Sequence, residues 1–461
     1  MMFPDDTIAA IATPIGQGGI AIVRLSGPDA LKIADRIFRP RNAARMPSKV
    51  LTYSVIYGLL IDPANCSPVD EVIVSVMHGP HSYTREDILE INGHGGMVII
   101  RRILEIVLAE GARLAEPGEF TKRAFLNGRI SLTQAEAVMD LITAKTEESR
   151  RIAADQLRGS LAEKLSATRN RLLDLCALAE VCIDFPEDEV ELKTSEQMGV
   201  ELEAVAQELE KLSRTYNEAR FFREGLATAI VGRPNVGKSS LLNALLARDR
   251  AIVTDRPGTT RDLIEEYLNI SGLPVRIIDT AGIRNSDETI EQEGIRRSLR
   301  ALENADCILA VFDGSMPLDA EDHSLIRKIS SGNVIIVVNK ADLDEQISFG
   351  NLLPVNSPLV RVSTLNGKGI DDLKSLIVTT NLKEWKEERE GVVITNLRQK
   401  QAIDQSVMAL GRAAQILCRN QPLEILALEL RDALEHVGSL TGDVTHEAIL
   451  DRIFSEFCIG K

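Results

Sequence analysis

The sequence predicts a multidomain α/β plus all-α protein. An N-terminal α+β domain precedes a discontinuous helical domain, which carries an inserted α/β domain. Three observations support this fold class. Residues 1–120 alternate short β-rich runs with Gly and Pro turns, residues 226–380 repeat a strand–loop–helix pattern, and helical patterns flank that second segment on both sides. Each pattern is typical of a different arrangement of secondary-structure layers.

Composition limits the classes of function. The 461-residue chain has a formal net charge of −15, so it lacks a broad basic surface, and RNA contact would need a local patch or a partner protein. Its six cysteines include no C-x-x-C pair, which argues against a disulfide framework or a zinc site. No basic leader or apolar run of roughly 18 residues is visible. We therefore expect a cytoplasmic protein that makes no membrane contact.

The N-terminal segment predicts a small α+β domain. The pattern of residues 97–109 is that of a helix, which Gly111 ends. Strand-like runs bounded by turn residues are Ile20–Leu25, Val50–Leu60, Val69–Met77 and Ile88–Ile91.

Helical patterns follow. Thr133–Glu136 reads as a capping box, in which the Thr and Glu side chains satisfy free backbone N–H groups. It opens a long helical pattern that reaches about Val181 and is broken at 184–187. A second capping box is predicted at Thr194–Gln197, opening a helix to about Ala219. One apolar stripe of that helix comprises Leu202, Val205, Leu209 and Leu212.

After about Leu397 the pattern is helical again. Its apolar stripes comprise Ile403, Val407 and Leu410, and then Leu423, Leu426, Leu430, Leu434 and Val437. A stripe without a partner leaves apolar area in water at about 25 cal/mol per Å². We therefore expect residues 121–222 and 381–461 to pack together as one helical domain, with residues 223–380 inserted between them.

The inserted segment predicts a mostly parallel sheet of the Ras-like P-loop type. Continuous apolar runs such as Val334–Val338 indicate strands that are buried on both faces. The predicted strands are Ala227–Val231, Ile264–Ile270, Val275–Ile278, Ile308–Phe312, Val334–Val338 and Leu359–Val362.

A phosphate-binding loop follows the first of these strands. Residues 232–239 read Gly-Arg-Pro-Asn-Val-Gly-Lys-Ser, which matches G-x-x-x-x-G-K-[ST]. We expect backbone N–H groups of this loop to bind phosphate beside a helix N-terminus. Lys238 would bridge the β- and γ-phosphates, and the Ser239 hydroxyl would bind Mg²⁺. The predicted nucleotide contacts in this loop are Asn235, Val236, Gly237, Lys238, Ser239 and Ser240.

Two further motifs complete a guanine-nucleotide set. Asp279 ends a strand and could reach Mg²⁺, while Thr280, Ala281 and the N–H of Gly282 would lie near the γ-phosphate. In the second motif, Asn339-Lys-Ala-Asp, a carboxylate can accept two hydrogen bonds from guanine that adenine cannot donate. The predicted base contacts are Asn339, Lys340, Asp342 and Ser363. The set predicts GTP rather than ATP.

The hydrolytic group is not evident from these motifs. The loop 254–262 occupies the position of a switch segment, where Thr260 or Thr259 would supply a second oxygen to Mg²⁺. Simple GTPases place a glutamine after D-x-x-G to orient water, but this chain has Ile283 there. A downstream polar residue, a bound cation or a partner must then assist hydrolysis.

These motifs resemble those of the bacterial and mitochondrial tRNA wobble-uridine modification GTPases of the MnmE/TrmE type. The resemblance covers essentially the whole chain. Beyond the nucleotide motifs it is carried by residues 13–19, 24–27, 90–96, 117–120, 123–127, 134–137, 183–186 and the Cys-Ile-Gly-Lys sequence at 458–461.

The resemblance implies that K⁺ takes the place of an arginine finger and that two G domains must meet for hydrolysis. Glu291 would orient the water, acting with Lys238 and Asn235. From the residues alone, Glu291 reads as a solvated carboxylate at a helix start. The implied potassium ligands are Asn235, Thr254, Arg256 and Thr259. Asn235, Thr254, Thr259 and Thr260 would also bind GTP.

The resemblance also implies a tetrahydrofolate site in the N-terminal domain, for a 5-formyl or 5,10-methylene derivative. The matching residues are Arg24, Glu90, Arg129 and Lys461, with Arg129 standing where the family often has lysine. Surface salt bridges would explain these lone charges equally well. For Cys458, an accessible thiol near the folate and a plain terminal cysteine both remain open.

The implied activity is addition of an aminomethyl or carboxymethylaminomethyl group to C5 of the tRNA wobble uridine, position 34. The family works as a homodimer with a flavin (FAD)-dependent partner protein, in a heterotetramer or a larger assembly. A GTP-dependent ribosome-assembly switch and a membrane-remodelling GTPase are the alternatives. The first would need a basic RNA-binding module and the second a lipid-binding segment, and the sequence shows neither.

Overall fold

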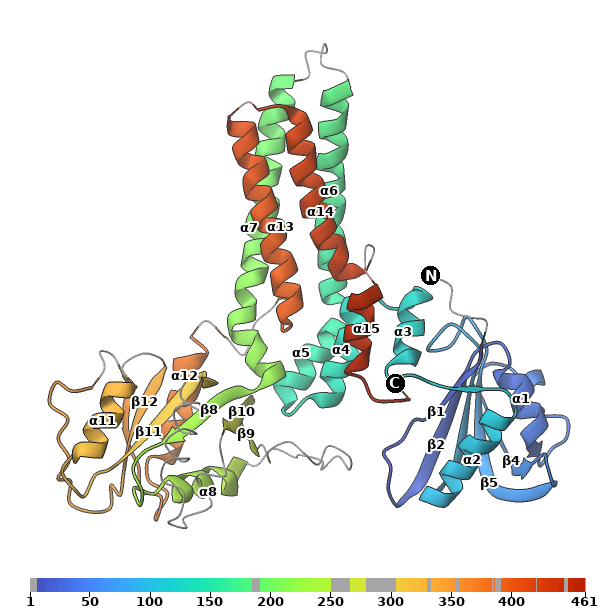
Figure 1. Cartoon of the computed structure of the whole chain (residues 1–461), viewed down its shortest axis with the longest axis horizontal. Coiled ribbons are helices and arrows are strands. Elements are labelled where there is room, and N and C mark those ends of the chain that lie inside the picture. Colours follow the sequence, from blue (N-terminus) through green and yellow to red (C-terminus); the bar gives the residue numbers. More distant parts are fainter. Residues whose placement is uncertain are drawn as a thin grey trace. The chain divides into compact units, whose positions relative to one another are not determined.

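The structure is a computed structural model of the chain. It describes residues 6–184, 191–249, 266–278, 304–329, 333–353, 357–383, 385, 391–419, 421–442 and 447–460. In this described part, contacts divide the chain into two compact units, residues 1–139 with 438–461 and residues 140–437. Figure 1 shows a blue sheet in the first unit and a helical bundle with a second sheet in the other.

The first unit is built on a mixed sheet with seven strands among the described residues. Its order is β3 (Phe38–Pro40), β4 (Ser54–Asp62), β5 (Ser67–Met77), β6 (Ile88–Gly95), β2 (Gly18–Ser26), β1 (Ile8–Ile11) and β7 (Arg113–Leu114). Neighbouring strands are antiparallel except β1 and β7. Helices α1 (Ala30–Ile37) and α2 (Met97–Ala109) cover one face (Figure 1). Alternate residues of β5, such as Val72 and Val74, lie in the core under these helices.

The predicted helix at 97–109 is confirmed, and so are the four predicted strands, with ends shifted by a few residues. The prediction missed α1, β1, β3, β7 and the short 3₁₀ helix at Pro47–Lys49. These elements are short, and a short run of residues shows too few repeats for its hydrophobic period to be recognised.

Three further helices belong wholly or partly to the first unit, namely α3 (Glu119–Leu126), α4 (Leu132–Thr143) and α15 (Glu447–Ser455). The capping box predicted at Thr133 is wrong, because Thr133 already lies inside α4. Ser131 and Gln134 form the reciprocal pair instead. The Ser131 Oγ accepts from the Gln134 N–H at 3.3 Å, and the Gln134 Oε1 accepts from the Ser131 N–H at 2.9 Å.

The helical pattern predicted from about residue 133 to 181 is confirmed, but the structure divides it among three helices. After α4 the chain forms α5 (Glu147–Arg158) and α6 (Ser160–Asp184). The Thr146 side chain caps α5 at one end, and Gly159, with φ of 104°, ends it at the other. The capping box predicted at Thr194 is wrong too, because α7 (Glu191–Glu224) begins before it.

The two helical flanks pack together, as expected. Helix α7 lies beside α13 (Leu397–Cys418), and α14 (Leu423–Thr441) completes the bundle (Figure 1). The Ser213 hydroxyl of α7 donates to the Asp404 carboxylate of α13. The predicted stripe is buried at Leu202, Val205, Leu209 and Leu212. The helical domain is therefore discontinuous in sequence, while its predicted boundaries at 120, 222 and 380 stay predictions.

A second sheet, with six strands among the described residues, forms the inserted domain. Its order is β13 (Leu359–Arg361), β12 (Val334–Asn339), β11 (Cys307–Asp313), β8 (Leu226–Val231), β10 (Leu273–Ile278) and β9 (Glu266–Ile270). All neighbours are parallel except β9, which is antiparallel to β10. Every residue of β8, β11 and β12 is buried, which confirms the predicted buried strands. Helices α8 (Lys238–Asp249), α11 (Ala320–Lys328) and α12 (Ile370–Asn381) accompany the sheet.

Candidate functional sites

The phosphate loop connects the buried strand β8 to the N-terminus of α8. Only glycine fits at two positions of this loop, because other atoms of the protein lie where a Cβ would be. A Cβ at Gly232 would overlap the carbonyl oxygen of Val311, and a Cβ at Gly237, whose φ is 100°, would overlap the Asn339 Nδ2. The loop therefore presents its backbone at the start of a helix, where N–H groups lack intrahelical partners.

Lys238 lies in this loop with its ammonium turned onto neutral acceptors. Its Nζ donates to the carbonyl oxygens of Gly232 and Arg233, both at 2.8 Å. Burial lowers the pKa of Lys238, and the nearby Glu321 carboxylate offsets only part of this effect. An anion at the loop would supply the opposite charge that a buried ammonium needs.

Asn339 joins the phosphate loop to the loop after β13. Its side chain is 1% exposed, and its Nδ2 donates to the Val236 carbonyl oxygen at 2.8 Å. Its Oδ1 accepts from the backbone N–H of Thr364 at 3.3 Å. The predicted base-binding residues and the phosphate loop thus form one connected structure.

The predicted guanine-reading carboxylate is oriented by a neighbour. The buried Ser363 donates its hydroxyl to Oδ1 of Asp342 at 2.5 Å, while Asp342 itself is exposed. Ser363 was predicted as a base contact, and the structure adds that its hydroxyl holds the Asp342 carboxylate. Ser239 and Ser240 lie in the first turn of α8 and are exposed.

Sequence reasoning missed Asp313, the last residue of β11. In the parallel sheet it pairs with Asn339 at the end of β12, and its carboxylate holds the Lys340 ammonium at 2.5 Å. Burial alone would raise the pKa of Asp313, but hydrogen bonds from Lys340 and Ser315 outweigh it and lower the pKa. A polar residue at the carboxyl end of a buried strand was the signal that could have found it.

The remaining predictions for the nucleotide site lie outside the described residues. They are Thr254, Arg256, Thr259, Thr260, Asp279, Thr280, Ala281, Gly282 and Glu291. No group of three or more His, Cys, Asp or Glu side chains suited to a metal ion occurs where the structure is described.

In the first unit the structure brings two predicted ligand-binding residues together. Arg24 of β2 lies directly opposite Glu90 of β6, and its Nε and Nη2 both lie 2.8 Å from Oε1 of Glu90. The Arg24 Nη1 also donates to the Gly460 carbonyl oxygen at 3.1 Å. The guanidinium carbon lies 5.7 Å from the centre of the Phe120 ring. Lys461, the residue after Gly460, is outside the described part.

Arg129 belongs to the same neighbourhood through aromatic contacts. Its guanidinium carbon lies 4.8 Å from the centre of the Tyr83 ring. Tyr83 packs against the small core that contains Phe120, the ring beside Arg24. The structure thus gathers three of the four predicted ligand residues around two aromatic rings. Cys458, near the same end of the chain, is exposed.

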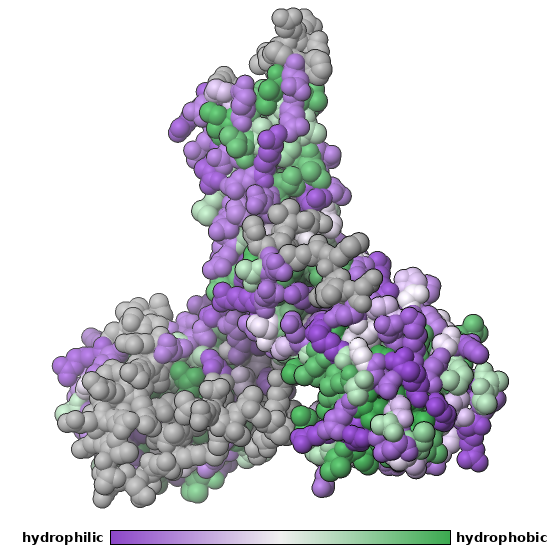
Figure 2. Space-filling view, turned by 45° about the vertical axis from the view of Figure 1, so that its right-hand side comes forward, coloured by the Kyte–Doolittle hydropathy of each residue, from purple (hydrophilic) through white to green (hydrophobic). Residues whose placement is uncertain are grey.

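The sheet face that carries Arg24 and Glu90 is opposite the face under α1 and α2. Two neighbouring rows cross β4, β5, β6 and β2, namely Val55, Ser75, Glu90 and Arg24, and then Tyr57, Ile73, Asn92 and Ile22. Val55, Tyr57 and Ile73 are exposed, and hydrophobic atoms are visible on the surface of this unit in Figure 2. An exposed apolar patch beside charged residues is typical of an interaction surface.

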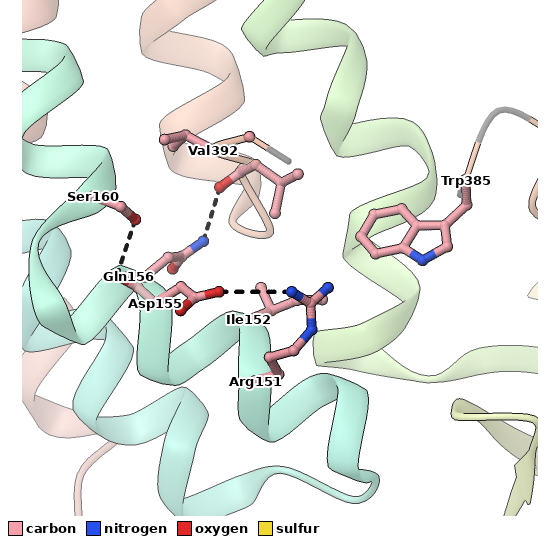
Figure 3. A pocket seen from close by; sticks show the side chains of 9 residues that line it. Arg151, Ile152, Asp155, Gln156, Ser160, Trp385 and Val392 are labelled. Carbon is pink, nitrogen blue, oxygen red and sulfur yellow. Dashed lines mark hydrogen bonds and ion pairs between the residues drawn. The ribbon is translucent and has the colours of Figure 1, made fainter. Parts of the chain in front are cut away.

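A pocket of about 260 Å³ lies between α5 and the segment that leads into α13 (Figure 3). Gln156 donates from Nε2 to the Val393 carbonyl oxygen at 3.0 Å. The lining residues are Arg151, Ile152, Asp155, Gln156, Ser160, Trp385 and residues 391–393. None of them belongs to the nucleotide motifs or to the Arg24 cluster, so this pocket is separate from both predicted sites.

The parallel sheet, the glycine-shaped phosphate loop and the linked Asn339 and Asp342 define the second unit's inserted domain as a P-loop guanine-nucleotide-binding domain. Two protein-family models match most of the chain, including the parts outside this domain. The MnmE helical domain matches residues 132–458, and the N-terminus of the GTP-binding protein TrmE matches residues 7–129. The chain belongs to the MnmE family of tRNA modification GTPases, and it is therefore a GTP-hydrolysing enzyme.

Full-length relatives agree. The tRNA modification GTPase MnmE of Geotalea uraniireducens is 46% identical over 461 residues, covering 100% of both chains. That of Geobacillus kaustophilus is 47% identical over 459 residues, covering 99% of both. Among solved structures, the G domain of the T. maritima FeoB iron transporter is 27% identical over 33% of this chain and 96% of its own, with a TM-score of 0.25. No described helix is long and apolar enough to span a bilayer.

Proposed function

We propose that this GTPase, with a flavin-dependent partner protein, installs an aminomethyl or carboxymethylaminomethyl group at C5 of the wobble uridine of tRNA. The one-carbon unit would come from a tetrahydrofolate derivative. The full-length identity to tRNA modification GTPases is the observation that carries this proposal. It is supported by a chain that has both a nucleotide loop and a separate cationic, aromatic cluster in its N-terminal unit.

The described residues fit a bound guanine nucleotide. The two glycines let the loop pack closely against Val311 and Asn339, and the desolvated Lys238 would donate to the β- and γ-phosphates. Asp342, oriented by Ser363, would accept from the guanine edge. We propose the remaining contacts as the sequence predicts them, with Val236, Ser240, Thr280, Ala281 and Gly282 near the phosphates.

Two cations complete the proposed hydrolytic site. Ser239 at the start of α8, together with Thr260, would hold Mg²⁺. Asn235, which is exposed and has φ of 63°, would hold K⁺ together with Thr254, Arg256 and Thr259. When bound, these ions offset the charge that develops on the phosphates. Glu291 would orient the attacking water, because Ile283 cannot, and pairing of two G domains would order these loops.

The Arg24 cluster fits a folate-type ligand. Among the described contacts, Arg24 meets only one oxygen of Glu90. The other carboxylate oxygen would accept hydrogen bonds from an amino-pyrimidine edge. The half-buried Tyr83 ring offers a flat surface, and the exposed Arg129 is accessible for an anionic tail. Lys461 would add a further positive charge.

The homodimer is proposed on the sheet face that carries this cluster. Val55, Tyr57 and Ile73 expose apolar area on that face, and burying it against a second copy would remove it from water. A ligand held by Arg24 and Glu90 would then lie beside the partner subunit. We also propose a cytoplasmic location and the domain boundaries predicted above, 1–120, 121–222, 223–380 and 381–461.

The test of the proposed function is mass spectrometry of wobble nucleosides from cells that lack this chain. Expression of the wild-type chain should restore the modified uridine, while Lys238→Ala should not. Unmodified uridine both in cells that lack the chain and in cells that express the wild-type chain would overturn the proposal. Full modification in cells that lack the chain would overturn it too.

The folate part has its own test. Arg24→Ala should weaken binding of 5-formyltetrahydrofolate in a calorimetric titration, because a charge-assisted contact and a stacked guanidinium are lost. Arg36→Ala is the matched control, since Arg36 is an exposed arginine of α1 that pairs with Glu110. Equal titrations for wild type and Arg24→Ala would remove Arg24 from the site.

A further inference from the structure

The Lys340 side chain is fixed by a residue that no nucleotide motif contains. Lys340 has a left-handed backbone, with φ of 64°, and its side chain is 37% exposed. Asp313, only 4% exposed, holds its ammonium at 2.5 Å. Asp313 is the last residue of β11, and Lys340 directly follows Asn339, the last residue of the neighbouring parallel strand β12.

Hydrogen bonds hold the residues on both sides of Lys340 in place. The preceding Asn339 is bonded to Val236 of the phosphate loop, and the Ala341 N–H donates to the Val362 carbonyl oxygen at 3.0 Å. Two residues further, Asp342 is held by Ser363. The long Lys340 side chain is the part of this segment that the backbone cannot fix, and a free lysine loses considerable rotamer entropy when it becomes ordered.

Asp313 is itself fully engaged. Its Oδ1 accepts from the Ser315 N–H at 3.0 Å and from the Ser315 hydroxyl at 2.6 Å, so its Oδ2 is directed to Lys340. A carboxylate with one oxygen anchored in a turn has little freedom to move. The ion pair is therefore held in place before any nucleotide arrives.

We propose that Asp313 is a positioning residue for guanine nucleotides. It acts through Lys340, whose four-carbon stem, held between the phosphate loop and Asp342, forms a wall against the purine face. This inference rests on the proposed contacts of Asn339 and Asp342. It adds to them a buried acid that pre-organises the lysine, so that its ordering is not a cost of nucleotide binding.

The direct test is Asp313→Asn, followed by titration with mant-GDP and mant-GTP, in which the fluorophore is on the ribose. The variant keeps an oxygen for Ser315 but loses the negative charge opposite Lys340. We expect affinity for both nucleotides to fall about tenfold, with kcat at saturating GTP changed by less than about twofold. Asp344→Asn, an exposed acid in the same loop, is the control and should bind as wild type does.

A double-mutant cycle separates positioning from turn stability. If Asp313 acts through Lys340, then Asp313→Asn should have less than about a twofold effect in a Lys340→Ala background. Ser315→Ala, which removes only the turn contact of the hydroxyl, should weaken binding less than Asp313→Asn does. An undiminished tenfold loss in the Lys340→Ala background would show that Asp313 serves the turn alone and would overturn the proposal.

Nucleotide titrations distinguish a failure of the Asp313 role from a failure of the nucleotide site itself. If wild-type protein binds mant-GDP and Asp313→Asn binds it equally well, only the role of Asp313 is wrong. If the wild-type protein itself shows no guanine-nucleotide binding, the proposed nucleotide site is wrong. The double-mutant cycle then has no wild-type affinity for comparison. Circular dichroism of each variant confirms that it is folded before titration.

Discussion

Phe222 and Trp385 meet where the chain enters and leaves the inserted domain, with ring centres 4.4 Å apart and planes inclined at 34°. Phe222 lies in the last turn of α7, shortly before β8, and Trp385 follows α12. The Ser149 hydroxyl donates to the Phe222 carbonyl oxygen at 2.6 Å. The two crossings between the helical bundle and the nucleotide domain are therefore joined to each other and to α5.

This contact can be followed directly, because Trp385 is the one tryptophan of the sequence. We expect Phe222→Leu to shift the intrinsic tryptophan emission to longer wavelength, since loss of the ring increases the contact of the indole with water. Phe349→Leu removes a ring that packs on Phe312 instead and should leave the emission unchanged. Identical spectra for wild type and Phe222→Leu would contradict the observed stacking.

Guanine recognition is tested by Asp342→Asn. An amide cannot accept both hydrogen bonds of guanine, but its NH₂ group can donate to the 2-oxo group of xanthine. We expect affinity for GTP to fall by about 100-fold or more, and affinity for XTP to rise. Competition of both nucleotides against mant-GDP, followed at equilibrium, measures the switch. Retention of the wild-type preference for GTP would show that another residue reads the base.

The close approach at Gly237 predicts a severe effect of Gly237→Ala. The added Cβ would displace the Asn339 amide, and the hydrogen bond to Val236 would be lost with it. We expect nucleotide binding to be abolished while the helical content in circular dichroism stays unchanged. The control is Gly411→Ala in α13, where a Cβ meets no atom within 4 Å and where alanine is the better helix former. Normal nucleotide affinity in Gly237→Ala would rule out this packing.

Acid stability should depend on Glu119 of α3. Burial would raise its pKa, but hydrogen bonds from Arg113, the Glu116 backbone and Arg123 outweigh it, so the pKa lies below the ordinary 4.5. A lowered folded-state pKa stabilises the fold at pH values above the ordinary pKa, and this stabilisation is lost as the pH falls through the folded value.

Glu119→Gln should therefore destabilise the protein at pH 7 by about 2 kcal/mol or more, because the buried Arg123 loses a counter-charge. It should also weaken the pH dependence of stability below about pH 4.5. Urea unfolding at several pH values measures both effects. Glu105→Gln, at an exposed acid of α2, should change neither, and parallel pH profiles for wild type and Glu119→Gln would contradict the assignment.

The sequence predicted those parts of the fold that repeat a pattern. β8 and β12 are continuous apolar runs, and the stripe from Leu202 to Leu212 shows the helical period; all are buried as expected. The start of α4 was misplaced by two residues, because Ser131 with Gln134 and Thr133 with Glu136 fit the same capping rule. Tertiary packing, not the local sequence, selects between them.

The nucleotide residues were predicted where they form a contiguous motif. Asp313 belongs to no motif and meets Lys340, 27 positions further along the chain, only through the parallel pairing of β11 and β12. The hydroxyl contact of Ser363 with Asp342 likewise depends on the loop after β13. Such contacts follow from the register of the sheet, which a single sequence does not specify.

We propose above all that this G domain hydrolyses GTP with K⁺ in the place of an arginine finger and with a second G domain paired to it. GTP turnover in KCl and in NaCl at equal ionic strength, over a range of protein concentrations, tests it most directly. We expect turnover per molecule to be at least about tenfold faster in KCl and to rise with protein concentration as G domains pair. Equal turnover in both salts, independent of concentration, would contradict the account.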